Sequence, residues 1–177
     1  MQGRIVSLAG LAAVAAALLA MAKTAAGRPQ LHDYLSDEEA GEIRDALAPS
    51  DRIKLYISFA EDRLAKFDYE INRTAPERDR SDVLNGLLHS YEGCMDDASD
   101  EIDDAARKQA DIKAALKLMN EKSKSFLSRL QKYSKNGRYL SDYSDTLQDA
   151  IDSTTDAIAA VTDAQKTMLP AVVRRKQ

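Results

Sequence analysis

An apolar residue recurs at almost every third or fourth position, without a break in phase, through the middle of this 177-residue chain. The series runs Leu84, Leu88, Tyr91, Met95, Ala98, Ile102, Ala105, Gln109, Ile112, Leu116, Met119, Ser123, Phe126, Leu130 and Tyr133, with polar residues at only two of its positions. Because an α-helix turns once in about 3.6 residues, these side chains share one helix face. No stretch shows the sustained alternation of β-branched residues that is typical of a strand. The sequence therefore predicts an all-α fold.

The same series leaves two architectures open. Residues 75–135 form either one helix about 90 Å long or two helices joined by a turn near 107–110. The unbroken phase favours the long helix, because a tight turn usually resets the register and carries Gly, Asn or Pro. The polar Gln109 keeps the turn as an alternative. The long helix gives an elongated, antiparallel, coiled-coil-like bundle, whereas the turn gives a conventional four-helix bundle.

Two helices are expected before this series. Ser36 and Glu39 have the spacing of a capping box, which begins a short helix that Pro49 stops. A second helix is expected from about Ser50 to near Asn72. Its apolar face consists of Ile53, Ile57, Ala60, Leu64, Phe67 and Ile71.

The boundaries of the later helices also have signals. Thr74 and Glu77 form a second capping box at the start of the long series. Asn136-Gly137 is expected to end it, with the glycine in the left-handed conformation. The last helix is expected over about residues 141–169. Leu140, Leu147, Thr154, Val161 and Met168 recur in it every seven residues, flanked by Ala150, Ala157 and Ala164.

The N-terminus has the features of a signal peptide. Arg4 precedes an uncharged apolar stretch over residues 5–22, and Ala20-Met21-Ala22 offers the small residues that signal peptidase accepts. Cleavage is expected after Ala22 or Ala26, which predicts export to the periplasm or the extracellular space and no membrane contact afterwards. An uncleaved N-terminal anchor is the alternative. The rest is divided into a linker over 27–35, one helical domain over 36–169 and a basic tail over 170–177.

Charge limits the possible partners. The net charge is −4 and the only basic excess is the short tail, so nucleic acid is a poor partner. The most conspicuous polar feature is an acidic run whose candidate metal ligands are Asp96, Asp97, Asp100 and Asp104, accompanied by Glu101 and Asp103. Clustered carboxylates suit Ca²⁺ or Mg²⁺, so a weak divalent-cation site is the alternative interpretation. A solvated acidic helix face is the favoured one.

His89 and Cys94 are the other chemically distinctive residues. Two histidines are too few for a multi-histidine metal site. His89 could bind haem together with a methionine such as Met95, but methionines in an apolar series are more often packing residues. The single Cys94 excludes an internal disulfide. A buried thiol is expected, and a disulfide between two chains is the alternative.

No catalytic motif emerges from the sequence. We therefore expect a non-enzymatic exported protein without a cofactor, acting through helix-mediated protein association, self-association or a structural role in the envelope. Leu147, Ile151, Ile158 and Val161 are candidate contact residues that serve equally well as core. The alternative is a periplasmic ligand- or cation-binding bundle that uses the acidic face over 96–104 or His89.

Overall fold

The described part of the chain, residues 34–74 and 79–168 of a computed structural model, consists of helices and their connections. The helices are α1 (Asp37–Asp45), α2 (Pro49–Asn72), α3 (Arg80–Arg107), α4 (Lys113–Asn136), the single 3₁₀ turn η1 (Leu140–Asp142) and α5 (Ser144–Thr167). These residues contain no strand, so the predicted all-α fold is confirmed. The expected signal peptide, the basic tail and Glu77 of the second capping box lie outside the described residues.

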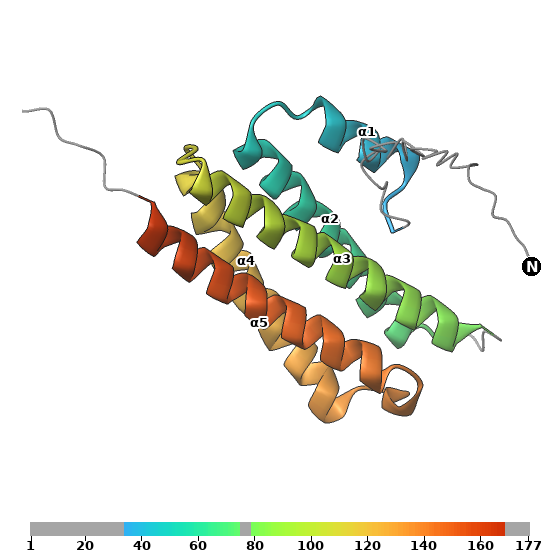
Figure 1. Cartoon of the computed structure of the whole chain (residues 1–177). Helices are drawn as coiled ribbons and strands as arrows, with labels where there is room; N and C mark the ends of the chain where they lie inside the picture. Colours follow the sequence, from blue (N-terminus) through green and yellow to red (C-terminus); the bar gives the residue numbers. More distant parts are fainter. Residues whose placement is uncertain (1–33, 75–78, 169–177) are drawn as a thin grey trace, which may run out of the picture. The chain divides into compact units, whose positions relative to one another are not determined.

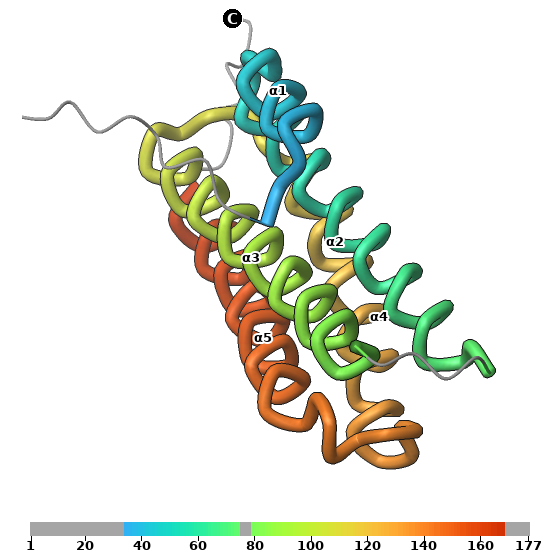
Figure 2. Tube along the Cα trace, turned by 90° about the vertical axis from the view of Figure 1, so that its right-hand side faces the viewer, coloured from blue at the N-terminus to red at the C-terminus, as the bar shows by residue number. Residues whose placement is uncertain are grey.

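The four long helices pack into a bundle (Figures 1 and 2). α2 contacts α3 and α4, and α5 contacts the same two helices, while the short α1 lies against α2. The faces that meet are the apolar series seen in the sequence. All six apolar positions of α2 are buried, as are those of the long series from Leu84 to Leu130 except Gln109. The buried inner face of α5 consists of Leu147, Thr154, Val161 and the three flanking alanines.

Aromatic side chains connect the helices inside this core. Phe67 of α2 packs edge-on against Tyr133 of α4 and Tyr143 just before α5, with ring centroids 5.2 and 5.3 Å apart. Tyr91 of α3 packs edge-on against Phe126 of α4 at 5.9 Å. The Tyr91 hydroxyl also shares a buried 2.6 Å hydrogen bond with the Thr154 hydroxyl of α5. Tyr91 therefore contacts α4 and α5 at the same level of the bundle.

The expected single helix over 75–135 is wrong, because the chain breaks between α3 and α4 over residues 108–112. Gln109 adopts the left-handed conformation, with φ 54°. The Gln109 amide donates to the Ala106 carbonyl and the Ala110 amide to the Ala105 carbonyl, at 3.1 and 2.9 Å. These two bonds form a Schellman closure with glutamine at the position that glycine usually occupies. The turn lies where the alternative architecture put it.

The end of α4 is confirmed, but the role expected for Gly137 is wrong. α4 ends at Asn136, and Gly137 has φ −68°, an ordinary extended conformation. Tyr139 takes the left-handed conformation instead, with φ 58°. A Cβ on residue 137 would overlap the Tyr143 hydroxyl and the Tyr133 carbonyl. Glycine is therefore needed here for close packing.

The first two helices begin at clear signals. The Ser36–Glu39 capping box is present, with the Glu39 amide 3.2 Å from Ser36 Oγ and the Ser36 amide 2.8 Å from Glu39 Oε2. α1 ends at Asp45, before Pro49, which is the first residue of α2. Proline is favourable there because the first helical amide has no partner within the helix. Tyr34 and Leu35, the last residues of the expected linker, pack against the core.

Candidate functional site

The acidic run of α3 is distributed among several neighbours. Asp96 accepts a 2.6 Å hydrogen bond from Ser153 of α5, and Asp97 accepts one from the Tyr34 hydroxyl. Glu101 pairs with Arg52 of α2 at 2.6 Å. Asp104 pairs with Arg107 and Lys108 at the end of its own helix. Asp100 and Asp103 are exposed.

The four candidate metal ligands therefore point toward different parts of the bundle. The Asp96 carboxylate is hydrogen-bonded to Ser153 of α5, whereas the Asp97 carboxylate is hydrogen-bonded to Tyr34 in the segment before α1. Within residues 34–74 and 79–168, no group of three or more His, Cys, Asp or Glu side chains could hold a metal ion. The run follows the surface of α3 without converging on a common point.

His89 lies on the surface of the bundle, whereas the methionines with which it could bind a haem lie in the core. The His89 side chain is 75% exposed, and its Nδ1 lies 3.3 Å from Glu92 on the same helix. Met95 and Met119, by contrast, are fully buried in the core. A haem held between His89 and one of these sulfurs would require the histidine to face inward. The structure does not bring these side chains together.

Cys94 is fully buried, as predicted. Burial raises the pKa of its thiol to about 12, and the Arg63 guanidinium offsets part of that effect. A thiol with such a pKa stays protonated and unreactive near neutral pH. Cys94 is therefore a core side chain.

A buried ion pair holds α1 against the bundle. Arg63 of α2 is only 8% exposed, and its guanidinium lies 2.6 Å from Glu39 and 2.7 Å from Asp62. Burial alone would raise the pKa of Glu39, but the hydrogen bonds from Arg63 and from the Ser36 amide lower it below its usual value. The pair fixes α1 against α2, and both terminal nitrogens of Arg63 donate to carboxylates of the chain itself.

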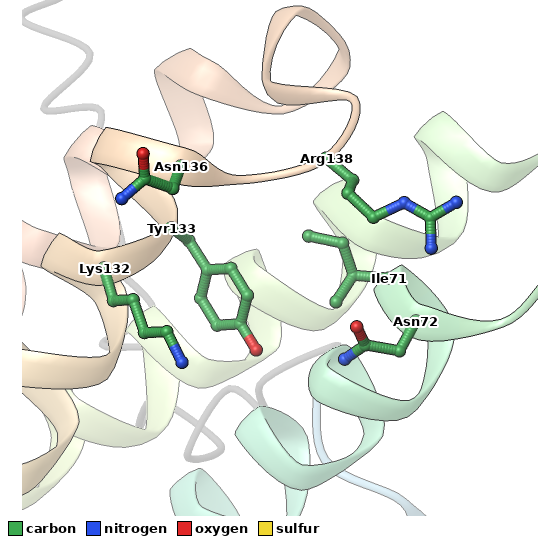
Figure 3. Close-up of a pocket in the computed structure, with 6 residues that line it drawn as sticks. All are labelled: Ile71, Asn72, Lys132, Tyr133, Asn136 and Arg138. Carbon is green, nitrogen blue, oxygen red and sulfur yellow. The ribbon is translucent and has the colours of Figure 1, made fainter.

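A hollow of about 240 Å³ lies where α2 and α4 end (Figure 3). Its lining comes from Ile71 and Asn72 of α2, Lys132, Tyr133 and Asn136 of α4, and Arg138 of the following loop. Lys132 and Arg138 would attract a small anion. The carbonyl ends of two helices at the same place have the opposite effect, because helix C-termini carry partial negative charge.

The outer face of α4 has a feature that the sequence analysis missed. α4 contains seven Lys and Arg residues and one Glu. Lys113, Lys117, Lys124 and Lys135 are exposed and separated by steps of four, seven and eleven residues. Such steps return to nearly the same side of a helix with about 3.6 residues per turn. We call these four residues the lysine stripe.

α5 carries the opposite charge on its outer face. It contains five aspartates and one lysine. The aspartate stripe consists of the exposed residues Asp145, Asp149, Asp152, Asp156 and Asp163. The same spacing rule that identified the apolar faces, applied to charges of one sign, would have revealed both stripes.

Neither stripe is neutralised by another helix of the described part of the chain. Lys117 has a distant partner in Glu121 of its own helix, at 3.9 Å. Asp163 pairs with Lys166, also on its own helix, at 2.8 Å. The structure shows no ion pair between the two stripes, although α4 and α5 are neighbours. Both charged surfaces are therefore available to another molecule.

Comparison with known proteins adds no assignment. No protein-family model, no curated protein and no solved structure matches this chain. Among the residues that the structure describes, no helix is both long enough and apolar enough to cross a membrane.

Proposed function

We propose that this chain is an exported, non-enzymatic helical protein that acts by associating with other protein through its outer helix faces. Its four long helices then form an up-down-up-down four-helix bundle that serves as a rigid support for these faces. Short connections of residues 108–112 and 137–143 support this topology, because they join helices that reverse direction.

The two charged stripes carry the proposal. Each is a straight row of exposed side chains on a rigid helix, and neither has a partner on another described helix. Rows of like charge cost free energy through mutual repulsion, and a complementary partner removes that cost. The side chains with distinctive chemistry have structural roles, because Cys94 is buried and Arg63 forms ion pairs with Glu39 and Asp62.

The alternative function, cation or ligand binding through the acidic run of α3 or through His89, has less support. Asp96, Asp97 and Asp104 each have a separate partner within the chain. A cation would have to displace these partners and draw together carboxylates from different sides of α3.

Site-specific photo-crosslinking tests the proposed function. A photoreactive amino acid is placed at the exposed positions Thr155 of α5 and Ser128 of α4, with exposed Ser58 of α2 as the matched control on another face. In the cells that produce the protein, we expect protein adducts at Thr155 and Ser128 and fewer at Ser58. An absence of adducts at all three positions would contradict association as the function.

A further inference from the structure

We infer that the outer face between α4 and α5 binds an acidic protein partner, whose contact surface carries Asp and Glu side chains around a few apolar ones. This inference rests on the proposed function, because it names the chemistry of the partner for one of the two charged surfaces. It follows from the way in which the bundle separates its positive and negative side chains.

The lysine stripe lies on the side of α4 remote from α2. Lys122 and Arg129 leave α4 toward α2, where they pair with Glu61 at 2.6 Å and with Asp68. Two residues along a helix correspond to a rotation of about 200°, so Lys124 points away from α2. The lysine stripe therefore follows the edge of α4 between solvent and its other neighbour, α5.

The aspartate stripe lies on a different side of the bundle, next to α3. Ser153 of α5 donates to Asp96 of α3, which marks the side of α5 that borders α3. Asp149 and Asp156 are within one turn of Ser153 and rotated from it by only about 40–60°. Asp163 lines a hollow of about 190 Å³ together with residues of α3. The carboxylates of α5 are therefore directed away from the lysine stripe.

The side of α5 that borders the lysine stripe is uncharged in its middle. Ile151 is two residues from Ser153 and is therefore rotated from it by about 200°, and Ile158 follows one heptad later on the same side. Both isoleucines are half-buried, and exposed Thr155 and Thr162 continue the strip one turn beyond each. The threonine hydroxyls donate to carbonyls of their own helix. This strip leaves apolar surface open to contact beside the positive charges.

Charge complementarity selects an acidic partner. The four lysines extend over about 33 Å of α4, and the one acidic residue of that helix, Glu121, lies 3.9 Å from Lys117. Leu127 of α4 is half-buried and adds to the apolar surface. Apolar side chains with charged ones at the rim are the usual arrangement of a protein interface, where the rim sets partner choice. Partner carboxylates relieve the mutual repulsion of the lysines, whereas a basic partner would increase it.

Charge reversal on the lysine stripe tests the inference. The photoreactive amino acid at Thr155 is combined with Lys117→Glu, Lys124→Glu and Lys135→Glu, and crosslinking is performed in the cells that produce the protein. We expect the yield of protein adducts to fall at least about fivefold, because the introduced carboxylates repel those of the partner. Mass spectrometry of the adduct from the unmodified stripe should identify a crosslinked peptide with more Asp and Glu than Lys and Arg.

A matched control separates the lysine stripe from net charge. Lys54→Glu, Lys66→Glu and Lys108→Glu together change the net charge by the same amount at exposed positions outside the face, and this variant should keep the full adduct yield. Circular dichroism verifies that every variant is folded. An acidic peptide from a second copy of this chain would support the inference and identify the partner as the chain itself.

Three results would overturn the inference: a neutral or basic crosslinked peptide, an adduct with lipid in place of protein, or an adduct yield that the lysine variant leaves unchanged. If protein adducts at Thr155 persist at full yield in the lysine variant, the inference fails while the proposed function stands. An absence of adducts at every position tested contradicts the proposed function itself.

Discussion

Gly93 shows how one residue positions the N-terminal segment. A Cβ at this position would overlap the ring of Tyr34, whose hydroxyl donates to Asp97. Gly→Ala within a helix normally stabilises by about 1 kcal/mol. For Gly93→Ala we expect instead that Tyr34 is displaced and that residues 34–45 lose protection in hydrogen exchange. Gly86→Ala, with no atom within 4 Å of the new Cβ, is the control and should gain up to about 1 kcal/mol. Unchanged protection of 34–45 in Gly93→Ala would contradict this role.

The buried thiol of Cys94 makes the free energy of unfolding depend on pH in the alkaline range. Burial raises the pKa of its thiol from 9.0 to about 12 in the folded chain. The unfolded thiol ionises above pH 9 while the folded one keeps its proton. The stabilisation is therefore complete below pH 9 and is lost as the pH rises toward 12, at up to about 1.4 kcal/mol per pH unit. Urea denaturation at pH 8, 9 and 10 should show a shallower decline in Cys94→Ala than in the unmodified protein. Parallel declines would show that the thiol does not contribute.

At the scale of the element, α1 depends on the buried ion pair of Glu39 and Arg63. Glu39→Gln retains the capping box but removes the charge, so Arg63 loses a buried partner. We expect the exchange protection of α1 to fall by about 1–3 kcal/mol. Glu42→Gln on the exposed side of α1 is the matched control and should have little effect.

Acid should lower the exchange protection of α1 in the same way as Glu39→Gln, because both remove the charge of Glu39. The pKa of Glu39 is lowered in the folded chain, so its contribution is present above its unfolded pKa and is lost as the pH falls through the folded value. As the pH falls below the usual range of a glutamate carboxyl, the hydrogen exchange of α1 should therefore approach that of Glu39→Gln. Equal protection of the unmodified protein at pH 7 and in acid would contradict the assignment.

The turn between α3 and α4 depends on the left-handed Gln109. A β-branched residue tolerates that conformation poorly, whereas glycine adopts it freely. We expect Gln109→Val to lower the free energy of unfolding by about 1–2 kcal/mol, and Gln109→Gly to change it by less than about 0.5 kcal/mol. Urea denaturation measures both. A Val variant as stable as the Gly variant would show that the turn is not fixed at this residue.

This turn also marks the limit of what the sequence could predict. Apolar spacing identified the buried faces of α2, α3, α4 and α5, because burial dictates residue type at each position. The break at 108–112 was not favoured, because the left-handed position carries glutamine and the apolar series resumes in phase at Ile112. Contacts between distant residues, such as Arg63 with Glu39, have no periodic signature. The charged stripes could have been predicted from the sequence if the spacing of positive and of negative residues had been considered separately.

At the scale of the whole bundle, charge is segregated by helix. α4 is strongly basic, while α3 and α5 are acidic, so opposite charges occupy different sides of one rigid support. The net charge of −4 conceals this separation. Segregated charge favours oriented, salt-sensitive association over tight binding, because exposed pairs contribute little individually and act mainly on orientation and rate.

Native mass spectrometry of the protein, expressed from residues 1–177 and purified without denaturant, is the most direct test of association as the function. We expect a chain cut after Ala22 or Ala26 that carries no metal ion or small organic ligand, present as a monomer, as a dimer or together with a protein partner. A stoichiometric mass excess that matches a metal ion or an organic ligand would contradict association as the function. In that case the exposed Asp100 and His89 would be the first residues to replace.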